Sequence, residues 1–270
     1  MPVAPITLIC LSVATLIVAL APVVLYRRLR KPFMLDWRDT VAGIAVFALF
    51  ATVIERALNN FMLGEGGASA TLLSHPAAFV AYGALVAGVC EEVGRYIAMR
   101  LIARRAGRRS DAPADSTGLG YGIGHGGAEV WLVGVLVQLQ WIVFSVLANR
   151  GELDSHLTNL PMDAVIRVHM ILATLSPAFA GVFLLERAAA LVFQLGLSVL
   201  MWRGVRAGSR TILPVAIVAH ALIDVPAAMY QARVATLPVV DGVYGVAAIV
   251  VAAALWRHCR ANPRTVSASA

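Results

Sequence analysis

Seven long apolar segments constrain the fold of this chain more than any other feature of its sequence. Each is long enough for a helix to cross ~30 Å of hydrocarbon at ~1.5 Å per residue. The chain is 60% hydrophobic and 14% charged, whereas soluble domains average about 45–50% and about 25%. The sequence therefore predicts an all-α, polytopic transmembrane bundle in a multi-pass protein of the cell membrane. The predicted spans are 4–26, 40–62, 77–100, 118–147, 177–202, 211–231 and 240–257.

A shorter apolar segment, 164–176, lies just before Pro177. It is too short to be an obvious span, so an eighth crossing stays an alternative to the count of seven. The segment is otherwise expected to be an interfacial helix or an N-terminal extension of the fifth span. We expect residues 1–260 to form one integral membrane domain, followed by a short cytoplasmic tail at 261–270.

The basic residues are distributed unevenly over the connections between the spans. Sixteen of the 22 Lys and Arg residues follow the first, third, fifth and seventh spans, whereas the opposite connections hold only Arg150, Arg167 and Arg233. The positive-inside rule then places the N-terminus outside and the C-terminus in the cytoplasm. The net charge of +7 is explained by this topology, so the expected partner is a lipid bilayer and no nucleic acid.

The stretch GVCEEVGRY, residues 88–96, places three ionisable side chains inside the third span. Such charges are costly in a membrane and are functional-site hypotheses by default. On a helix, Arg95 lies one turn from both Glu91 and Glu92 and can pair with one of them. We expect it to pair with Glu92, which leaves Glu91 available as a general base. Spacing alone does not decide between the two glutamates, and a structural ion-pair lock is the alternative.

The stretch GLGYGIGHGGAEVW, residues 118–131, places His125 and Glu129 four residues apart on one helical face. Glycines surround the histidine. They are explained either as a small-residue seam for helix packing or as space beside His125 for a substrate backbone. A second pair with the same spacing, His220 and Asp224, lies in VAHALIDVP, residues 217–225.

Depth in the membrane predicts that residues from three spans meet. Counted from the cytoplasmic ends of their helices, Glu91 lies ~13 Å deep, His125 ~10 Å and His220 ~13 Å. A carboxylate and two imidazoles at one level indicate hydrolysis. Glu91 would deprotonate a water that His125 orients, and His220 would hydrogen-bond the developing oxyanion. Asp224 would fix the tautomer of His220 or itself donate a proton.

Zinc chemistry is an alternative that the residues leave open. Glu91, His125 and His220 could bind zinc and keep an open position for water. The sequence contains no HExxH motif. The residues themselves do not decide between zinc and a site without a cofactor.

The order of these motifs resembles the YhfC family of intramembrane proteases over nearly the whole chain. The motifs are EExxR at 91–95, GxGHGGxE at 122–129, ER at 186–187 and HAxxD at 220–224. That family is similar to the CAAX prenyl endopeptidase and bacteriocin-processing group. The resemblance implies that Glu91 activates water with His125, and that His220 and Asp224 form the oxyanion pair. These relatives were long called metalloproteases, but we favour a glutamate-activated water without metal.

The sequence departs from the related patterns in three places. The CAAX group spaces its arginine one residue further, as EExxxR, and usually ends its last motif in Asn where this chain has Asp224. YhfC-like chains are expected to carry a histidine eight residues after the ER, where this chain has Gln194. Glutamine hydrogen-bonds a carbonyl or amide but is a poor metal ligand. An altered specificity or an inactive relative therefore stays open.

The expected function is an intramembrane endopeptidase that hydrolyses peptide bonds of membrane-protein or lipidated-peptide substrates. Glu91, His125, His220 and Asp224 are its predicted catalytic residues, and Glu92, Arg95, Glu129 and Gln194 support them. One alternative is a catalytically inactive relative that acts as a membrane binding or scaffold protein. The other is a proton-coupled transporter, because buried Glu, His and Asp also form proton relays.

Overall fold

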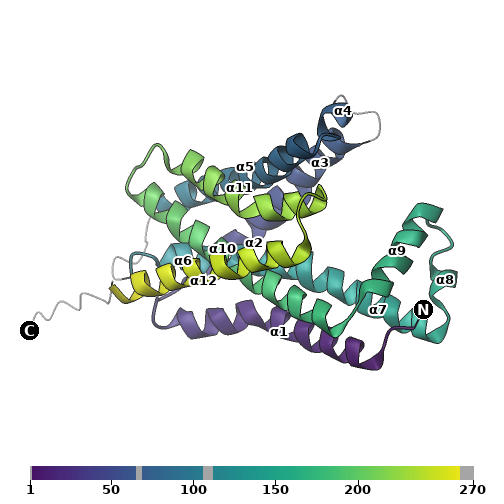
Figure 1. Ribbon diagram of the computed structural model, residues 1–270. Coiled ribbons are helices and arrows are strands. Elements are labelled where there is room, and N and C mark those ends of the chain that lie inside the picture. The colour runs from purple at the N-terminus through teal and green to yellow at the C-terminus, as the bar shows by residue number, and fades with distance from the viewer. Residues whose placement is uncertain (1, 65–68, 106–111, 262–270) are drawn as a thin grey trace, which may run out of the picture. The chain divides into compact units, whose positions relative to one another are not determined.

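The described part of the chain is built from helices, and no strand occurs in it. The computed structural model describes residues 2–64, 69–105 and 112–261 (Figure 1). Seven of its helical segments are long and apolar enough to cross a membrane, which confirms the predicted all-α fold with seven spans. The five spans that are uninterrupted α-helices are α1 (Pro5–Arg30), α5 (Pro76–Ala103), α10 (Pro177–Arg206), α11 (Ile212–Gln231) and α12 (Leu237–Ala261).

The two remaining spans each contain one π-helical turn. The second span, Trp37–Leu63, consists of α2 (Trp37–Leu49), η1 (Phe50–Glu55) and α3 (Arg56–Leu63). The fourth span, Ser116–Arg150, consists of α6 (Ser116–Glu129), η2 (Val130–Val135) and α7 (Leu136–Arg150). Single π turns inside α-helices are frequent at functional sites. Two short helices, α4 (Ala70–Leu73) and α8 (Leu153–His156), lie in connections.

The segment expected at 164–176 forms a separate helix, α9 (Met162–Thr174). Leu175 has an extended backbone, with φ −64° and ψ 130°, and α10 begins two residues later at Pro177. A proline disfavours the helical conformation of the residue before it, here Ser176, so a helix usually ends at or before that residue. The alternative of an extension of the fifth span is therefore wrong. The 13 residues of α9 reach ~20 Å, too short for the bilayer, and an interfacial position stays a prediction.

The chain divides into two compact units, which are described separately. The first comprises Met1–Ala21 and Glu129–Ala188, and the second comprises Pro22–Ala128 and Ala189–Ala270. In the first unit, the Asn149 amide hydrogen-bonds the backbone of Val3 twice, at 2.6 and 2.9 Å, and so joins α7 to the chain start. The predicted single domain at 1–260 stays a prediction, and tail residues 262–270 lie outside the described residues.

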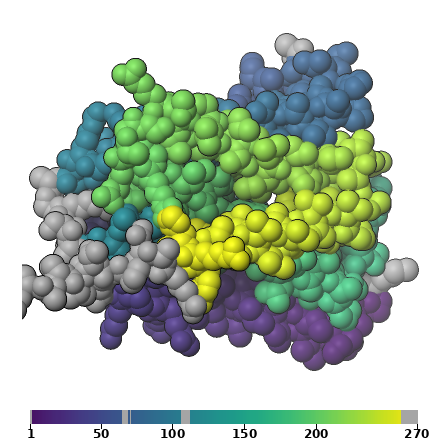
Figure 2. Space-filling view, turned by 60° about the vertical axis from the view of Figure 1, so that its left-hand side comes forward, coloured from purple at the N-terminus to yellow at the C-terminus, as the bar shows by residue number. Residues whose placement is uncertain are grey.

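The surface of the second unit carries apolar side chains of the kind that contact lipid. Figure 2 shows α12 at the surface of the molecule. Its large apolar side chains are exposed, with Ile249 at 70% and Val246 at 65%. Soluble monomers rarely expose contiguous apolar patches of this kind, so the composition of α12 fits contact with hydrocarbon.

Helix α5 approaches α11 closely because it carries a glycine at the contact. A Cβ atom on Gly88 would lie 3.0 Å from the Ile217 carbonyl oxygen and 3.3 Å from the Ala221 nitrogen. Side chains rarely tolerate such distances, so glycine permits this approach of the two backbones. The contact lies one turn from Glu91 on α5 and beside His220 on α11.

The glycines of α6 serve helix packing. A Cβ atom on Gly124 would lie 1.9 Å from the Thr40 carbonyl oxygen of α2. A Cβ atom on Gly126 would lie 2.9 Å from the Cβ of Gln194 on α10. The packing-seam interpretation is therefore confirmed. The interpretation that these glycines leave room for a substrate backbone is wrong, because α2 and α10 fill the space beside them.

Candidate active site

The predicted charge cluster on α5 is buried inside the second unit. Arg95 and Glu92 are 0% exposed and Glu91 is 6% exposed. The Nε atom of Arg95 lies 3.1 Å from Oε2 of Glu92, whereas its Nη2 atom lies 3.9 Å from Oε2 of Glu91. Arg95 and Glu92 are close enough for an ion pair, although the two atoms are not aligned as a hydrogen bond. Arg95 is thus nearer to Glu92, as the sequence analysis expected.

Helix α10 supplies the other partners of the Arg95 guanidinium. Nη1 donates to the Gln194 carbonyl oxygen at 3.0 Å and to the Ser198 hydroxyl, and Nη2 donates to Oε1 of the Gln194 amide. The same amide donates through Nε2 to Oε2 of Glu91 at 3.0 Å. Gln194 therefore bridges the guanidinium and the Glu91 carboxylate, and neutralises neither.

His125 contacts the glutamate that the sequence analysis assigned to it. Its Nε2 atom lies 2.9 Å from Oε2 of Glu91, and the side chain is fully buried. The ring stacks on Tyr121 with centroids 5.7 Å apart and forms a T-shaped pair with Phe47, with centroids 5.2 Å apart. With Glu91 ionised, the Nε2 atom is protonated and donates a hydrogen bond to the carboxylate. Both hydrogen bonds of the Glu91 side chain therefore reach the same oxygen, Oε2.

His220 lies among three carboxylates. Its Nδ1 atom is 2.8 Å from Oε1 of Glu92, and its Nε2 atom is 3.5 Å from Oδ2 of Asp224 and 4.0 Å from Oε2 of Glu91. His220 is buried, whereas the Asp224 side chain is 30% exposed. Glu92 is thus the closest group that can fix the His220 tautomer, a role that the sequence analysis gave to Asp224.

The structure brings together seven of the eight residues predicted for the site. They are Glu91, Glu92, Arg95, His125, Gln194, His220 and Asp224. Glu129 ends α6 and belongs to the other compact unit, so its supporting role stays a prediction. Sequence reasoning missed Ser198. The available signal was its position four residues after Gln194, on the same face of α10.

The cluster carries more negative than positive formal charge. Glu91 and Glu92 lie beside the Arg95 guanidinium and Asp224 lies beside His220, so the three carboxylates carry two more formal charges than the guanidinium if both imidazoles are neutral. Buried charge without a counter-charge is costly. A cluster of this kind attracts protons or cations, which suits acid–base chemistry.

The residues also offer donor types that zinc accepts, namely carboxylate oxygen and imidazole nitrogen. In the structure, however, Glu91 and His125 bond directly to each other, and His220 Nε2 is 4.0 Å from the same carboxylate oxygen. Among the residues that the structure describes, no group of three or more His, Cys, Asp or Glu side chains could hold a metal ion. The side chains as arranged form a hydrogen-bonded cluster, and zinc stays the alternative.

A sequence model of the family described as "YhfC intramembrane metalloprotease" matches residues 17–245. The match covers most of the 270-residue chain. The chain belongs to the YhfC family. Its match to the YhfC family includes every predicted site residue, from Glu91 to Asp224.

A curated relative supports the same assignment to the YhfC family. The chain is similar to "Uncharacterized membrane protein YhfC" of Bacillus subtilis (strain 168), with 28% identity over 222 residues. The alignment covers 82% of this chain and 84% of the relative. No solved structure matches the chain. This YhfC-family chain is therefore a multi-pass membrane protein, and its similarity to the CAAX group stays a prediction.

Proposed function

We propose that the chain is an intramembrane endopeptidase that hydrolyses peptide bonds of membrane-associated substrates. The observation that carries this proposal is the contact between Glu91 and His125, 2.9 Å long and buried within membrane-spanning helices. A carboxylate held by an imidazole inside the membrane is suited to activate water. The description of the YhfC family as an intramembrane metalloprotease supports the same reaction class.

Glu91 acts as the general base in the proposed reaction. Its Oε2 atom accepts hydrogen bonds from His125 and Gln194, which fix the plane of the carboxylate. Its side chain retains 8% exposure, so Oε1 can take a proton from water. The water oxygen then forms a bond to the scissile carbonyl carbon. Glu91 returns the proton to the amide nitrogen as the C–N bond breaks, and the products are a carboxylic acid and an amine.

His220 and Asp224 stabilise the oxyanion of the tetrahedral intermediate. Nδ1 of His220 is held by Glu92 at 2.8 Å, so Nε2 is the ring atom left to face the substrate. When doubly protonated, His220 donates from Nε2 to the oxyanion while Nδ1 stays on Glu92. Asp224, at 3.5 Å from Nε2, donates in its place if it carries the proton itself.

Cleavage by the purified protein tests this proposal. Wild type and the variants Glu91→Gln and His125→Ala are incubated in detergent with a library of peptides from membrane proteins, and new termini are identified by mass spectrometry. We expect both variants to lose cleavage by at least about 100-fold, the scale of general-base catalysis. Glu55→Gln is the matched control, because Glu55 lies on another span outside the cluster. Full cleavage by Glu91→Gln would contradict the proposal.

A chelator arm of the same assay addresses the metal in the family description. Wild type is assayed before and after treatment with a zinc chelator, and again after zinc is returned. We expect cleavage to persist through chelation, because Glu91 and His125 bond directly to each other in the cluster. Loss of cleavage with the chelator and its recovery with zinc would contradict the metal-free mechanism. The chain would then be a metal-dependent peptidase.

An inactive binding relative is the second candidate, and Gln194 is the observation that favours it. The family resemblance leads us to expect histidine there, and the chain has an amide that bonds Arg95 and Glu91 instead. If no peptide is cleaved by wild type but Gln194→His gains cleavage, the chain is an inactive relative. Proton flux into liposomes without cleavage by either protein would indicate transport.

A further inference from the structure

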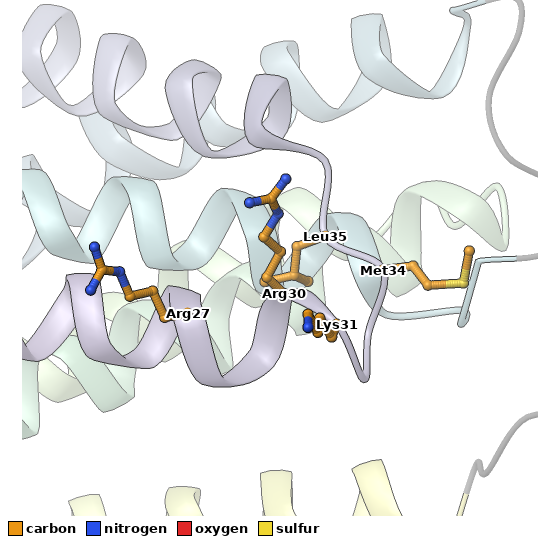
Figure 3. Close-up of a pocket in the computed structure, with 5 residues that line it drawn as sticks. All are labelled: Arg27, Arg30, Lys31, Met34 and Leu35. Atoms are coloured by element: carbon orange, nitrogen blue, oxygen red, sulfur yellow. The ribbon is translucent and has the colours of Figure 1, made fainter.

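A basic pocket lies at the end of α1, in the second unit and apart from the candidate active site. Its lining residues are Arg27, Arg30, Lys31, Met34 and Leu35, and its volume is about 600 Å³. Figure 3 shows Arg27 and Arg30 extending from the same side of α1. Three cations and no acid line this pocket. A volume of this size is typical of sites that bind small molecules.

The turn after α1 gives the pocket a fixed apolar wall. The Leu35 N–H donates to the Arg30 carbonyl at 3.0 Å, and the Met34 N–H donates to the Lys31 carbonyl at 3.3 Å. With Met34 in the left-handed region at φ 51°, these bonds form a Schellman cap. Leu35 is 6% exposed, and the Met34 carbonyl accepts from the Ser116 hydroxyl at 3.1 Å. The turn is thus anchored to the start of α6.

The three cations are available to a ligand. Within the described part of the chain, Arg27, Arg30 and Lys31 form no ion pair. The helix end itself favours positive charge, and the carbonyls of Arg30 and Lys31 are already occupied by the cap. The neighbouring Arg28 carries the same charge and lies in the same helical turn, but it does not line the pocket. The helix dipole therefore does not explain why the other three cations line one cavity.

Apolar surface continues from the pocket along α1 toward the interior of the span. Val23 and Val24 are exposed, at 46% and 51%, and lie one helical turn before Arg27. A ligand whose charge occupies the pocket would lay an adjoining hydrocarbon chain over these valines. Because α1 is a candidate membrane span that ends at Arg30, the pocket also lies at the level expected for lipid phosphates.

We propose that this pocket binds the headgroup of an anionic phospholipid. Arg27, Arg30 and Lys31 contact its phosphate oxygens, Met34 and Leu35 contact the glycerol, and an acyl chain lies along Val23 and Val24. Inorganic phosphate shares the charge but cannot contact the valines. The site is separate from Glu91 and His125, and the proposal does not depend on the proteolytic function.

Native mass spectrometry of the detergent-purified protein tests the site. The protein is titrated with phosphatidylglycerol or with phosphatidylcholine of the same acyl chains, and the lipid-bound fraction is measured. We expect Arg27→Gln/Arg30→Gln to weaken phosphatidylglycerol binding by more than about tenfold, because the variant loses charge-assisted hydrogen bonds to the phosphate. Arg28→Gln/Arg38→Gln removes the same charge from the same end of the chain and should change binding less than threefold.

Three outcomes would overturn the proposal. Equal weakening by both double variants would show a general surface field and no pocket. If wild type bound phosphatidylcholine as tightly as phosphatidylglycerol, the charge of the headgroup would not select the lipid. Displacement of phosphatidylglycerol by an equal concentration of inorganic phosphate would show a simple anion site. Thermal unfolding without lipid, expected to be the same for both variants, confirms that each is folded.

Discussion

The guanidinium of Arg95 determines how the residues of the cluster are arranged. It is 0% exposed and contacts Glu92, Gln194 and Ser198, which come from two helices. An unpaired charge in this position would be far more costly than the pair. Arg95 therefore holds Glu92 and Gln194 in place, and these two residues in turn contact His220 and Glu91.

Replacing one partner of the ion pair should be worse than replacing both. We expect Arg95→Met to destabilise the protein by about 3–5 kcal/mol, because Glu92 is then left as a buried, uncompensated charge. The double variant Glu92→Gln/Arg95→Met should recover part of that loss. Unfolding in mixed detergent micelles measures both free energies. Additive losses in the double variant would show that the two side chains are not coupled.

Gln194 should orient Glu91 through hydrogen bonds. Gln194→Leu keeps the side-chain size and removes the donor to Glu91 and the acceptor from Arg95. We expect stability to fall by about 1–3 kcal/mol for each buried group left unsatisfied, and cleavage to fall through kcat with KM little changed. Gln194→Glu restores the acceptor without the donor. If both variants keep wild-type kcat, Gln194 does not position the base.

At this scale the sequence predicted which residues would cluster but not all of their contacts. Spacing of three and four residues paired Arg95 with the glutamates and His220 with Asp224, because those neighbours share one helix. The contact of His220 with Glu92 joins residues 128 positions apart. It depends on how α11 is rotated about its axis relative to α5. The apolar periodicity of either helix does not predict this rotation.

Among the elements, glycine contacts set how closely the helices of the second unit approach. A Cβ atom on Gly124 would overlap the Thr40 carbonyl oxygen, whereas one on Gly242 of α12 would have no described atom within 4 Å. The two helices thus use the same residue type for different reasons. On α6 glycine is required by the neighbouring backbone, and on α12 it is not.

The substitution Gly124→Ala should therefore separate α6 from α2 and displace His125. We expect a loss of more than about 2 kcal/mol of stability, in the range of overpacked cores, together with a loss of cleavage. Gly242→Ala is the matched control and should be neutral or stabilise by about 0.5–1 kcal/mol. Thermal unfolding and peptide cleavage compare the two. Equal stability of both variants would contradict the close approach.

The helical elements were largely predictable because hydrocarbon thickness fixes their length. All seven predicted spans coincide with helices to within a few residues. The break between α9 and α10 follows from Pro177. The π turns η1 and η2 have no comparable signal, because the inserted residue only shifts the helical phase, by about 100°, and a span that is apolar on most faces does not reveal such a shift.

For the whole molecule, the distribution of basic residues predicts which side of the membrane each end faces. We expect green fluorescent protein fused to the C-terminus to fluoresce and alkaline phosphatase at the same point to be inactive, because the positive-inside rule predicts a cytoplasmic C-terminus. Fusions at Arg150 should give the opposite result. The same response at both positions would overturn the predicted topology.

The buried charges of α5 also bear on how the chain is inserted as it is synthesised. With a mean hydropathy of 1.4, α5 is the least hydrophobic of the seven candidate spans. Its partners Gln194, Ser198 and His220 lie 99 to 128 residues further along the chain. During synthesis α5 therefore reaches the translocon before those partners are made, with only Glu91 and Glu92 of its own helix beside Arg95. The helix is expected to stay beside the translocon, or to rely on a membrane chaperone, until α10 and α11 emerge.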